Sequence, residues 1–203
     1  MITAVRTQTF KNLQLNAGAF LVGFDYSTIK SLSALKTALA TALADESKTL
    51  GATRGGGTFT AAPEARNIEA DGKRYEFKGS TVFDSWSISM TGTLIEITPE
   101  NMQRILATAD VTGDASSGIK TIRVRTDVKD DDYLSSVVWV GDTSKGAMLI
   151  KLENALNTAG ATLTITDKGE GTLPFEFYAH QSSVEDSEYA PFEIVYLDPA
   201  QSV

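Results

Sequence analysis

The sequence predicts a mainly β fold of antiparallel strands with two helices, and two observations support this. Apolar and polar residues alternate with a period of two through several segments, as they do in half-buried strands. Two other stretches show the spacing of amphipathic helices instead. The chain has 203 residues and no cysteine, so we expect a single domain over residues 1–203 whose core needs no disulfide framework.

The clearest predicted strand is Ser85–Leu94, where alternate residues from Trp86 to Met90, and then Leu94, are apolar. The alternation slips at Leu94 and Ile95, which indicates a bulge or a strand that passes between environments. Similar patterns predict four further strands: Thr121–Thr126, Ala161–Thr166, Leu173–Tyr178 and Phe192–Leu197. The apolar faces of the last two are predicted to be Leu173, Phe175 and Phe177, and Phe192, Ile194 and Tyr196.

Two segments break the strand pattern. In Thr98–Asp110, Thr98 suits an N-cap, Pro99 suits the first helical position, and apolar residues follow at spacings of three and four. In Ser31–Ala44, leucines form a narrow stripe among Ala and Thr. We expect a helical insertion at about 30–46, either packed on the sheet or available to a partner.

A charged hairpin is predicted in the middle of the chain, protruding at about 60–80. Asp71 and Gly72 are typical of a type I′ turn, with arms at about Ala62–Ala70 and Lys73–Gly79. The arms carry Glu64, Arg66, Glu69, Lys73, Arg74, Glu76 and Lys78. An isolated charged hairpin is marginally stable in water, so it either leans on another surface or remains mobile and solvated.

Composition and charge exclude several classes of function. The chain has 18 Lys and Arg against 26 Asp and Glu, a formal net charge of -8, and one His. These counts exclude thiol nucleophiles, Cys-ligated zinc and any site with two imidazoles, and they argue against phosphate clamping as the main activity. Residues 1–6 do not resemble a signal peptide and no apolar run could span a bilayer, so we expect a soluble protein made in a cytoplasm.

Three features resemble catalytic or phosphate-binding elements: two short motifs and the single histidine. Gly51–Thr58 has the glycines of a phosphate-binding loop, but Gly57 stands where that motif needs Lys, so we expect a turn or a close backbone approach. Asp114–Gly118 resembles a nucleophile elbow, but it lies in a polar loop and lacks the first Gly. His180 would be the sole general base, and we expect it to be hydrogen-bonded or exposed.

The charged segment over residues 123–132 is equally weak evidence for a catalytic or metal-binding site. Asp127 and Asp130–Asp132 could gather oxygens around Ca²⁺, but the central Gly and terminal Glu of an EF-hand are missing, so a solvated acidic loop is expected. Arg123 and Arg125 suit a polar strand face or inter-subunit ion pairs better than a nucleic-acid groove. The sequence therefore predicts no enzyme activity, no cofactor and no metal site.

The order of segments resembles the major tail (tail tube) proteins of long-tailed bacteriophages. The matching segments are Leu50–Phe59, Pro63–Glu64, Ile68–Lys73, Lys78–Gly79, Trp86, Thr91–Leu94, Glu96–Asn101, Phe175–His180 and Pro191–Tyr196. They lie between Ala17 and Leu197, and the resemblance rests on their order and spacing. Ser31–Ala44 matches least well and resembles an insertion.

The resemblance implies an antiparallel β-sandwich or barrel with a flanking α-helix. It also implies hexameric rings that stack into a hollow tube around a tape-measure protein, closed by tail-tip and tail-terminator proteins. Double-stranded DNA would pass through the lumen of this virion tail, which would be assembled in the bacterial host cytoplasm. By analogy, Pro63–Gly79 would contact a neighbouring subunit or ring. The contact residues would be Glu64, Arg66, Glu69, Asp71, Lys73, Arg74 and Lys78.

The net charge is confined to one half of the chain. Residues 1–100 hold 10 acidic and 10 basic side chains, whereas residues 101–203 hold 16 acidic and 8 basic ones. Acids of the second half would repel DNA in a lumen, because each phosphate neutralised by Lys or Arg strengthens binding. The alternative function is a non-catalytic carbohydrate-binding or adhesin-like β-sandwich, which would need an exposed aromatic platform.

Overall fold

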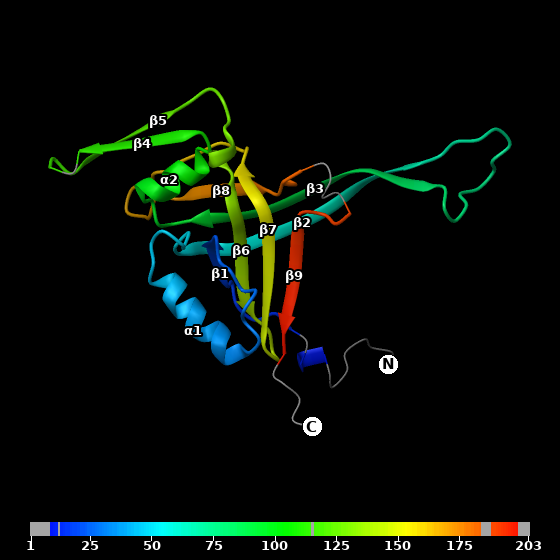
Figure 1. Ribbon diagram of the computed structural model, residues 1–203, viewed down its shortest axis with the longest axis horizontal. Coiled ribbons are helices and arrows are strands. Elements are labelled where there is room, and N and C mark those ends of the chain that lie inside the picture. Colours follow the sequence, from blue (N-terminus) through cyan, green and yellow to red (C-terminus); the bar gives the residue numbers. More distant parts are fainter. Residues whose placement is uncertain (1–8, 12, 115, 184–187, 199–203) are drawn as a thin grey trace.

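Nine strands, two α-helices and two short 3-10 helices make up the described part of the chain, residues 9–11, 13–114, 116–183 and 188–198 of a computed structural model (Figure 1). In chain order they are η1 (Thr9–Lys11), β1 (Ala19–Val22), α1 (Leu32–Leu43), β2 (Thr53–Asn67), β3 (Thr81–Leu94), α2 (Pro99–Ile105), β4 (Ala109–Asp114), β5 (Ile119–Val124), η2 (Asp130–Asp132), β6 (Leu134–Asp142), β7 (Ala147–Asn157), β8 (Leu173–Tyr178) and β9 (Phe192–Leu197). None of the helices in these residues is long and apolar enough to cross a membrane.

Seven strands form one antiparallel sheet that branches at β7 and so produces two layers. The first layer has the order β1-β6-β7-β9, and the second has the order β8-β3-β2. The first part of β7, Ala147–Leu152, pairs with β9, whereas Leu156 and Asn157 pair with β8. The predicted antiparallel, sandwich-like α+β architecture is confirmed.

The core between the two layers depends on two glycines that face each other across β2 and β3. Gly57 pairs with Gly92. A Cβ at Gly57 would lie 2.5 Å from Cζ of Phe20, and one at Gly92 would lie 2.6 Å from Cζ of Phe175. The missing side chains leave room for these two rings, which pack edge to face with centroids 5.1 Å apart. The expected close backbone approach at Gly57 is therefore confirmed.

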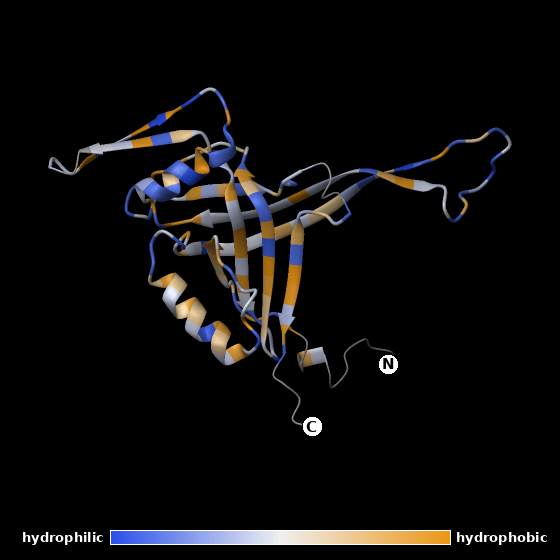
Figure 2. Cartoon of the chain, viewed as in Figure 1, coloured by the Kyte–Doolittle hydropathy of each residue, from blue (hydrophilic) through white to orange (hydrophobic). Residues whose placement is uncertain are grey.

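A second core lies on the other face of the first layer, under α1. Leu35 and Ala42 of α1 pack against Leu21, Val138 and Leu149 of the sheet. Hydrophobic bands on β6, β7 and β9 mark the strand faces that these two cores bury (Figure 2). Helix α1 thus forms a third layer, and the prediction of a helix in Ser31–Ala44 packed on the sheet is confirmed, with Ser31 as its N-cap.

Several details of the predicted secondary structure of the body are wrong. Ala161–Thr166 is not a strand: it makes one bridge, Thr164 to Thr172, and its Leu163 and Ile165 side chains are exposed. The slip at Leu94 and Ile95 marks the end of β3 rather than a bulge. Helix α2 has the predicted cap at Thr98 and Pro99 at its start, but it ends at Ile105. The left-handed backbone of Ala107 (φ 57°) then turns the chain into β4.

Two hairpins project from the body in opposite directions (Figure 1). The longer one is the continuation of β2 and β3 beyond the second layer. The shorter one is formed by β4 and β5, which pair only with each other among the described residues.

Candidate functional site

The outer part of the β2–β3 hairpin lies outside the hydrophobic core of the body. Its strands remain paired as far as Asn67 and Thr81, well beyond the residues that pack in the core. The pairing shifts by one residue between Glu64 and Ala65, so Asp84 is an extra residue in β3 at that point. We call the part of the hairpin from Pro63 to Asn67 and from Thr81 to Trp86 the shaft.

Cross-strand polar contacts hold the shaft together. Arg66 Nε donates to Asp84 Oδ1 at 2.8 Å, and Ser85 Oγ donates to Glu64 Oε2 at 2.9 Å. Near the outer end, Thr81 Oγ1 donates to Asn67 Oδ1 at 2.7 Å. Two predicted contact residues, Glu64 and Arg66, therefore already have partners within their own hairpin.

The end of the hairpin is a loop over residues 68–80, which we call the tip. Lys73 N donates to Ala70 O at 3.1 Å across the turn at Asp71 and Gly72. Of the two central residues of this turn, Asp71 and Gly72, only Gly72 has a positive φ (83°). This is therefore not the predicted type I′ turn, which requires positive φ at both. The predicted arm Lys73–Gly79 is also wrong, because the second strand begins at Thr81.

Lys73 organises the tip and is not presented to a partner. Its side chain is only 8% exposed, and Nζ donates to Ile68 O at 2.9 Å and to Glu76 Oε2 at 2.7 Å. Ser80 Oγ also donates to Glu76. The Lys73 ammonium lowers the pKa of the Glu76 carboxyl, with Ser80 contributing in the same direction. This network closes the loop from within.

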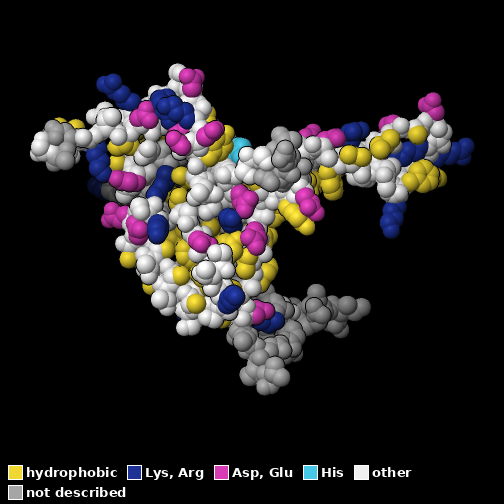
Figure 3. Space-filling view, viewed as in Figure 1, with side chains coloured by type: hydrophobic (Ala, Val, Ile, Leu, Met, Phe, Trp, Pro, Cys, Tyr) yellow, Lys and Arg dark blue, Asp and Glu magenta, His cyan; other side chains and the backbone are white. Residues whose placement is uncertain are grey.

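The remaining charged residues of the tip surround exposed apolar side chains. Tyr75 is 79% exposed and Phe77 is 63% exposed, with Ile68 exposed beside them. The structure gives no hydrogen bond or ion pair to the side chains of four other predicted contact residues, within the residues it describes: Glu69, Asp71, Arg74 and Lys78. Figure 3 shows these hydrophobic and charged side chains intermixed at the end of the projection.

The shaft carries a second exposed apolar group on the face that continues from the core. Phe83 is 58% exposed and Trp86 is 47% exposed, and their rings meet edge to face with centroids 5.6 Å apart. The sequence pattern placed Trp86 and Tyr196 on core faces. That is wrong, because the body ends before it covers them. Tyr196 is 66% exposed.

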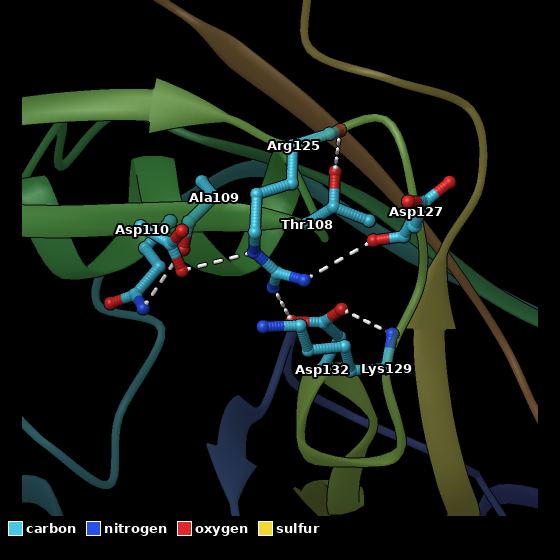
Figure 4. Close-up of polar contacts among 8 residues, drawn as sticks. Thr108, Ala109, Asp110, Arg125, Asp127, Lys129 and Asp132 are labelled. Atoms are coloured by element: carbon cyan, nitrogen blue, oxygen red, sulfur yellow. Dashed lines mark hydrogen bonds and ion pairs between the residues drawn. The ribbon is translucent and has the colours of Figure 1, made fainter.

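The charged segment after β5 forms a structural network rather than an open acidic loop (Figure 4). Arg125 Nε donates to Asp110 Oδ1 at 3.0 Å and Nη1 donates to Asp127 O at 3.2 Å, while Nη2 pairs with Asp132. The Lys129 amide donates to the other oxygen of Asp132 at 2.7 Å. The described residues hold no group of three or more His, Asp and Glu placed to bind a metal ion.

The electrostatics of Asp132 follow from these contacts. Partial burial acts to raise the pKa of its carboxyl, but the hydrogen bonds from the Lys129 amide and the Arg125 guanidinium outweigh it and keep the pKa below the ordinary value. The same carboxylates raise the pKa of Arg125, the Asp132 contact most strongly. The network therefore holds the base of the β4–β5 hairpin against η2 with full charges on both sides.

His180 and the two remaining candidate motifs lie in ordinary structural contacts, an irregular strand and a turn. The ring Nδ1 of His180 lies 3.1 Å from Asn154 O, and its ring packs edge to face on Tyr133. Gly55 and Gly56 have positive φ near the start of β2, where its pairing with β3 is irregular between Thr53 and Gly57. The chain continues after them as a strand and not as a helix. Asp114–Gly118 spans the turn of the β4–β5 hairpin, with Ala115 outside the described residues.

No known protein-family model matches the chain, and no curated protein sequence matches it significantly.

The sequence prediction located the hairpin but missed four of its exposed apolar side chains as contact residues: Tyr75, Phe77, Phe83 and Trp86. A usable signal was present for the first two, because Tyr75 and Phe77 alternate with charged residues in the predicted arm Lys73–Gly79, beyond the strands predicted for the core. For Phe83 and Trp86 no such signal existed, since their burial depends on where the second layer ends.

Proposed function

We propose that this protein is a non-catalytic structural subunit that assembles with copies of itself through the β2–β3 hairpin. The observation that carries the proposal is the tip, where Tyr75 and Phe77 are held in water on a long, internally braced projection. Exposed apolar groups surrounded by charged residues are typical of protein-interaction surfaces. The Lys73 network orders the loop before binding, which lowers the entropic cost of association.

The assembly that we propose is a stack of hexameric rings, the tail tube of a long-tailed bacteriophage. The resemblance in segment order supports it, and so does the combination of a sandwich-like body, flanking helices and a projecting hairpin at about 60–80. In that role the protein would be part of the virion and would be assembled in the host cytoplasm. Its partners would be other copies and the tape-measure, tail-tip and tail-terminator proteins.

The acidic second half of the chain suits a DNA conduit. Lys168 is the last basic residue, and residues 169–203 contain no Lys or Arg. We infer that acids of residues 101–203 face the lumen and repel the duplex, so that DNA slides without binding. An electropositive lumen in the assembled tube would contradict this part of the proposal.

The assembly is tested by removing the tip while the shaft is kept. Replacing residues 68–80 with Asn-Gly joins Asn67 to Thr81 through a two-residue turn and touches no core residue. We expect the purified wild-type protein to form rings or tubes at high concentration, and the variant to remain monomeric with an unchanged fold. Sedimentation and negative-stain imaging measure this outcome. A matched control replaces residues 113–120 of the other hairpin with Asn-Gly, and it should still assemble.

Lys73 should be left out of any test of surface charge. Because its side chain is enclosed by the tip, reversing its charge would disrupt the loop itself. Arg74 and Lys78 are the basic residues whose change reports on a contact alone. Wild-type protein that stays monomeric at all concentrations would overturn the proposed function.

A binding module is the second candidate, because Phe83 and Trp86 form an exposed aromatic pair. Such a pair could stack on a sugar ring. A Trp86→Ala variant that loses binding to a glycan array, with wild-type protein remaining monomeric, would favour this candidate over the assembly. Assembled wild-type protein without glycan binding would exclude it.

A further inference from the structure

The last strand, β9, has a free edge beside the projecting hairpin. Within the described chain β9 pairs only with β7, so the backbone groups along its other edge have no strand partner. In Figure 1 this edge faces the space beneath the β2–β3 hairpin. An uncovered edge is a template for another strand.

One face of β9 also exposes apolar side chains. Phe192, at the start of the strand, packs against Phe59 with ring centroids 5.3 Å apart. Further along, Ile194 and Tyr196 share that face but are exposed, although their β7 partners Ile150 and Met148 continue the core. The second layer ends before it reaches them, so no strand of that layer covers the strip formed by Ile194 and Tyr196.

The surroundings of the strip are acidic. Glu193 and Asp198 lie on either side of Ile194 and Tyr196 in the sequence, and both are exposed. Glu193 accepts a hydrogen bond from Tyr26 Oη at 2.6 Å. Burial and that contact raise the pKa of Tyr26, so its phenol remains the donor in this hydrogen bond. Two basic side chains lie nearby: Lys145 beside Tyr196 and Asp198, and Lys151, which is opposite Glu193 in β7 and pairs with Glu153.

The tip has the complementary pattern. In the segment Arg74–Lys78, the exposed rings of Tyr75 and Phe77 are two residues apart, as are Ile194 and Tyr196. In the free chain Tyr75 lies at a bend and Lys78 in a turn; once the segment straightens into a strand, side chains two residues apart point to the same face. Arg74 and Lys78 flank the rings with positive charge, and Glu76 between them is paired with Lys73.

We propose that the segment Arg74–Lys78 of one copy adds as a strand to the free edge of β9 of a second copy. Tyr75 and Phe77 then cover Ile194 and Tyr196. In either strand direction, one of the two cations lies opposite Glu193 and the other lies beside Asp198. Backbone pairing supplies affinity and the charged ends set the register.

The occupant is a second copy because one chain cannot make this contact with itself. Phe59 packs on Phe192, and eight residues of extended β2 separate Phe59 from Asn67, a span of about 26 Å at 3.3 Å per residue. The tip is thus held far from its own β9. Each copy carries both surfaces, so the contact joins two different patches and propagates into a ring or a stack.

This inference rests on the proposed function, because it uses the tip as the contact arm. Its direct test is a disulfide crosslink, which is clean because the chain has no cysteine. Strand addition brings opposed Cα atoms to about 5 Å, within disulfide range. A Tyr75→Cys variant is mixed with a Tyr196→Cys variant, or with an Ile194→Cys variant for the other strand direction, and the mixture is oxidised.

We expect one of these mixtures to give a covalent dimer in high yield. The matched control mixes Tyr75→Cys with Ile119→Cys, an exposed position on the β4–β5 hairpin, and should give none. If neither β9 position crosslinks above this control while the wild type still assembles and the tip deletion does not, the inference is wrong and the proposed function stands. Crosslinks limited to unrelated added protein would also overturn it.

Charge reversal gives an independent measurement. R74E/K78E and E193K/D198K should each raise the protein concentration needed for assembly by about tenfold or more, the equivalent of about 1.4 kcal/mol. Mixing the two variants should restore part of the loss, because reversed charges meet again. E193Q keeps an acceptor for Tyr26 and so tests the charge of Glu193 without removing that hydrogen bond. K30E/K36E, which reverses two exposed lysines just before and within α1, should have no effect. Unchanged assembly of E193K/D198K would contradict the inference.

Discussion

The two projecting hairpins of this protein are stabilised in opposite ways. The β2–β3 hairpin is the outer part of strands whose inner halves form the second layer of the core. The β4–β5 hairpin shares no sheet with the body in the described chain, and ion pairs near its turn and at its base attach it. Lys120 pairs with Glu100 of α2 at 2.7 Å, and Arg125 pairs with Asp110 and Asp132.

This difference determines which charges remain for a partner. A two-stranded hairpin is marginally stable in water, and Lys120 and Arg125 are used to attach β4–β5 to the body. The β2–β3 hairpin is held by the core and by Lys73 within its loop, which leaves Arg74 and Lys78 at the tip. Three predictions sharpen the comparison, from the largest expected effect to the smallest.

The base of the β2–β3 hairpin should be part of the global folding unit. Gly92→Val places a side chain against the buried Phe175 ring, with Cβ 2.6 Å from Cζ. We expect the free energy of unfolding to fall by about 3 kcal/mol, because overpacking a core forces side chains and backbone to move. Chemical denaturation measures it.

The matched control is Gly113→Val in β4, where a Cβ would lie 3.5 Å from its nearest neighbour, Ile119 O. It should change the stability of the body little. Equal losses for the two variants would show that the hairpins do not differ in the way described.

The base of the β4–β5 hairpin should instead respond locally, and to pH. Because the folded-state pKa of Asp132 lies below its ordinary value of 3.8, its contribution is complete above that pH and is lost as the pH falls through the lowered value. We expect the protection factors of the β4 and β5 amides, which compare the observed exchange rate with the intrinsic rate at the same pH, to fall selectively in acid. Arg125→Met should speed this exchange by about tenfold already at neutral pH.

Exchange measured by mass spectrometry separates the two hairpins in one experiment. Asp132→Asn, which removes the titrating group, should flatten the acid dependence of β4 and β5. Acceleration spread evenly over the whole body would mean that the Arg125 network belongs to the global folding unit.

Lys73→Met should have the smallest effect on stability and should be confined to the tip. It keeps the aliphatic stem but removes the donor to Ile68 O and Glu76, so the loop over residues 68–80 should become more sensitive to proteolysis. The melting temperature should stay nearly constant, because the tip packs against no part of the core. Lys48→Met, which removes an exposed ion pair with Asp45, is the control and should leave cleavage of the tip unchanged. A large fall in melting temperature would show that the tip supports the body.

The sequence by itself determined the elements whose signal is local. Thr98 was recognisable as a helix cap, the leucine stripe located α1, and period-two alternation located β8 and β9 to the residue. The charged hairpin and the glycine approach at Gly57 were also evident, because turn residues and glycines act through the backbone nearby. Composition by itself excluded thiol nucleophiles and sites with two imidazoles, because a fold cannot arrange side chains that the chain does not contain.

Only the tertiary structure decided which apolar faces are covered. Alternation gives Leu173 and Tyr196 the same status, yet Leu173 is buried and Tyr196 is exposed, because the second layer stops short of the end of β9. Likewise, Lys73 and Arg74 are adjacent cations, but the fold of the tip encloses one and presents the other. Burial and pairing depend on neighbours distant in sequence, and a local pattern contains no record of where those neighbours end.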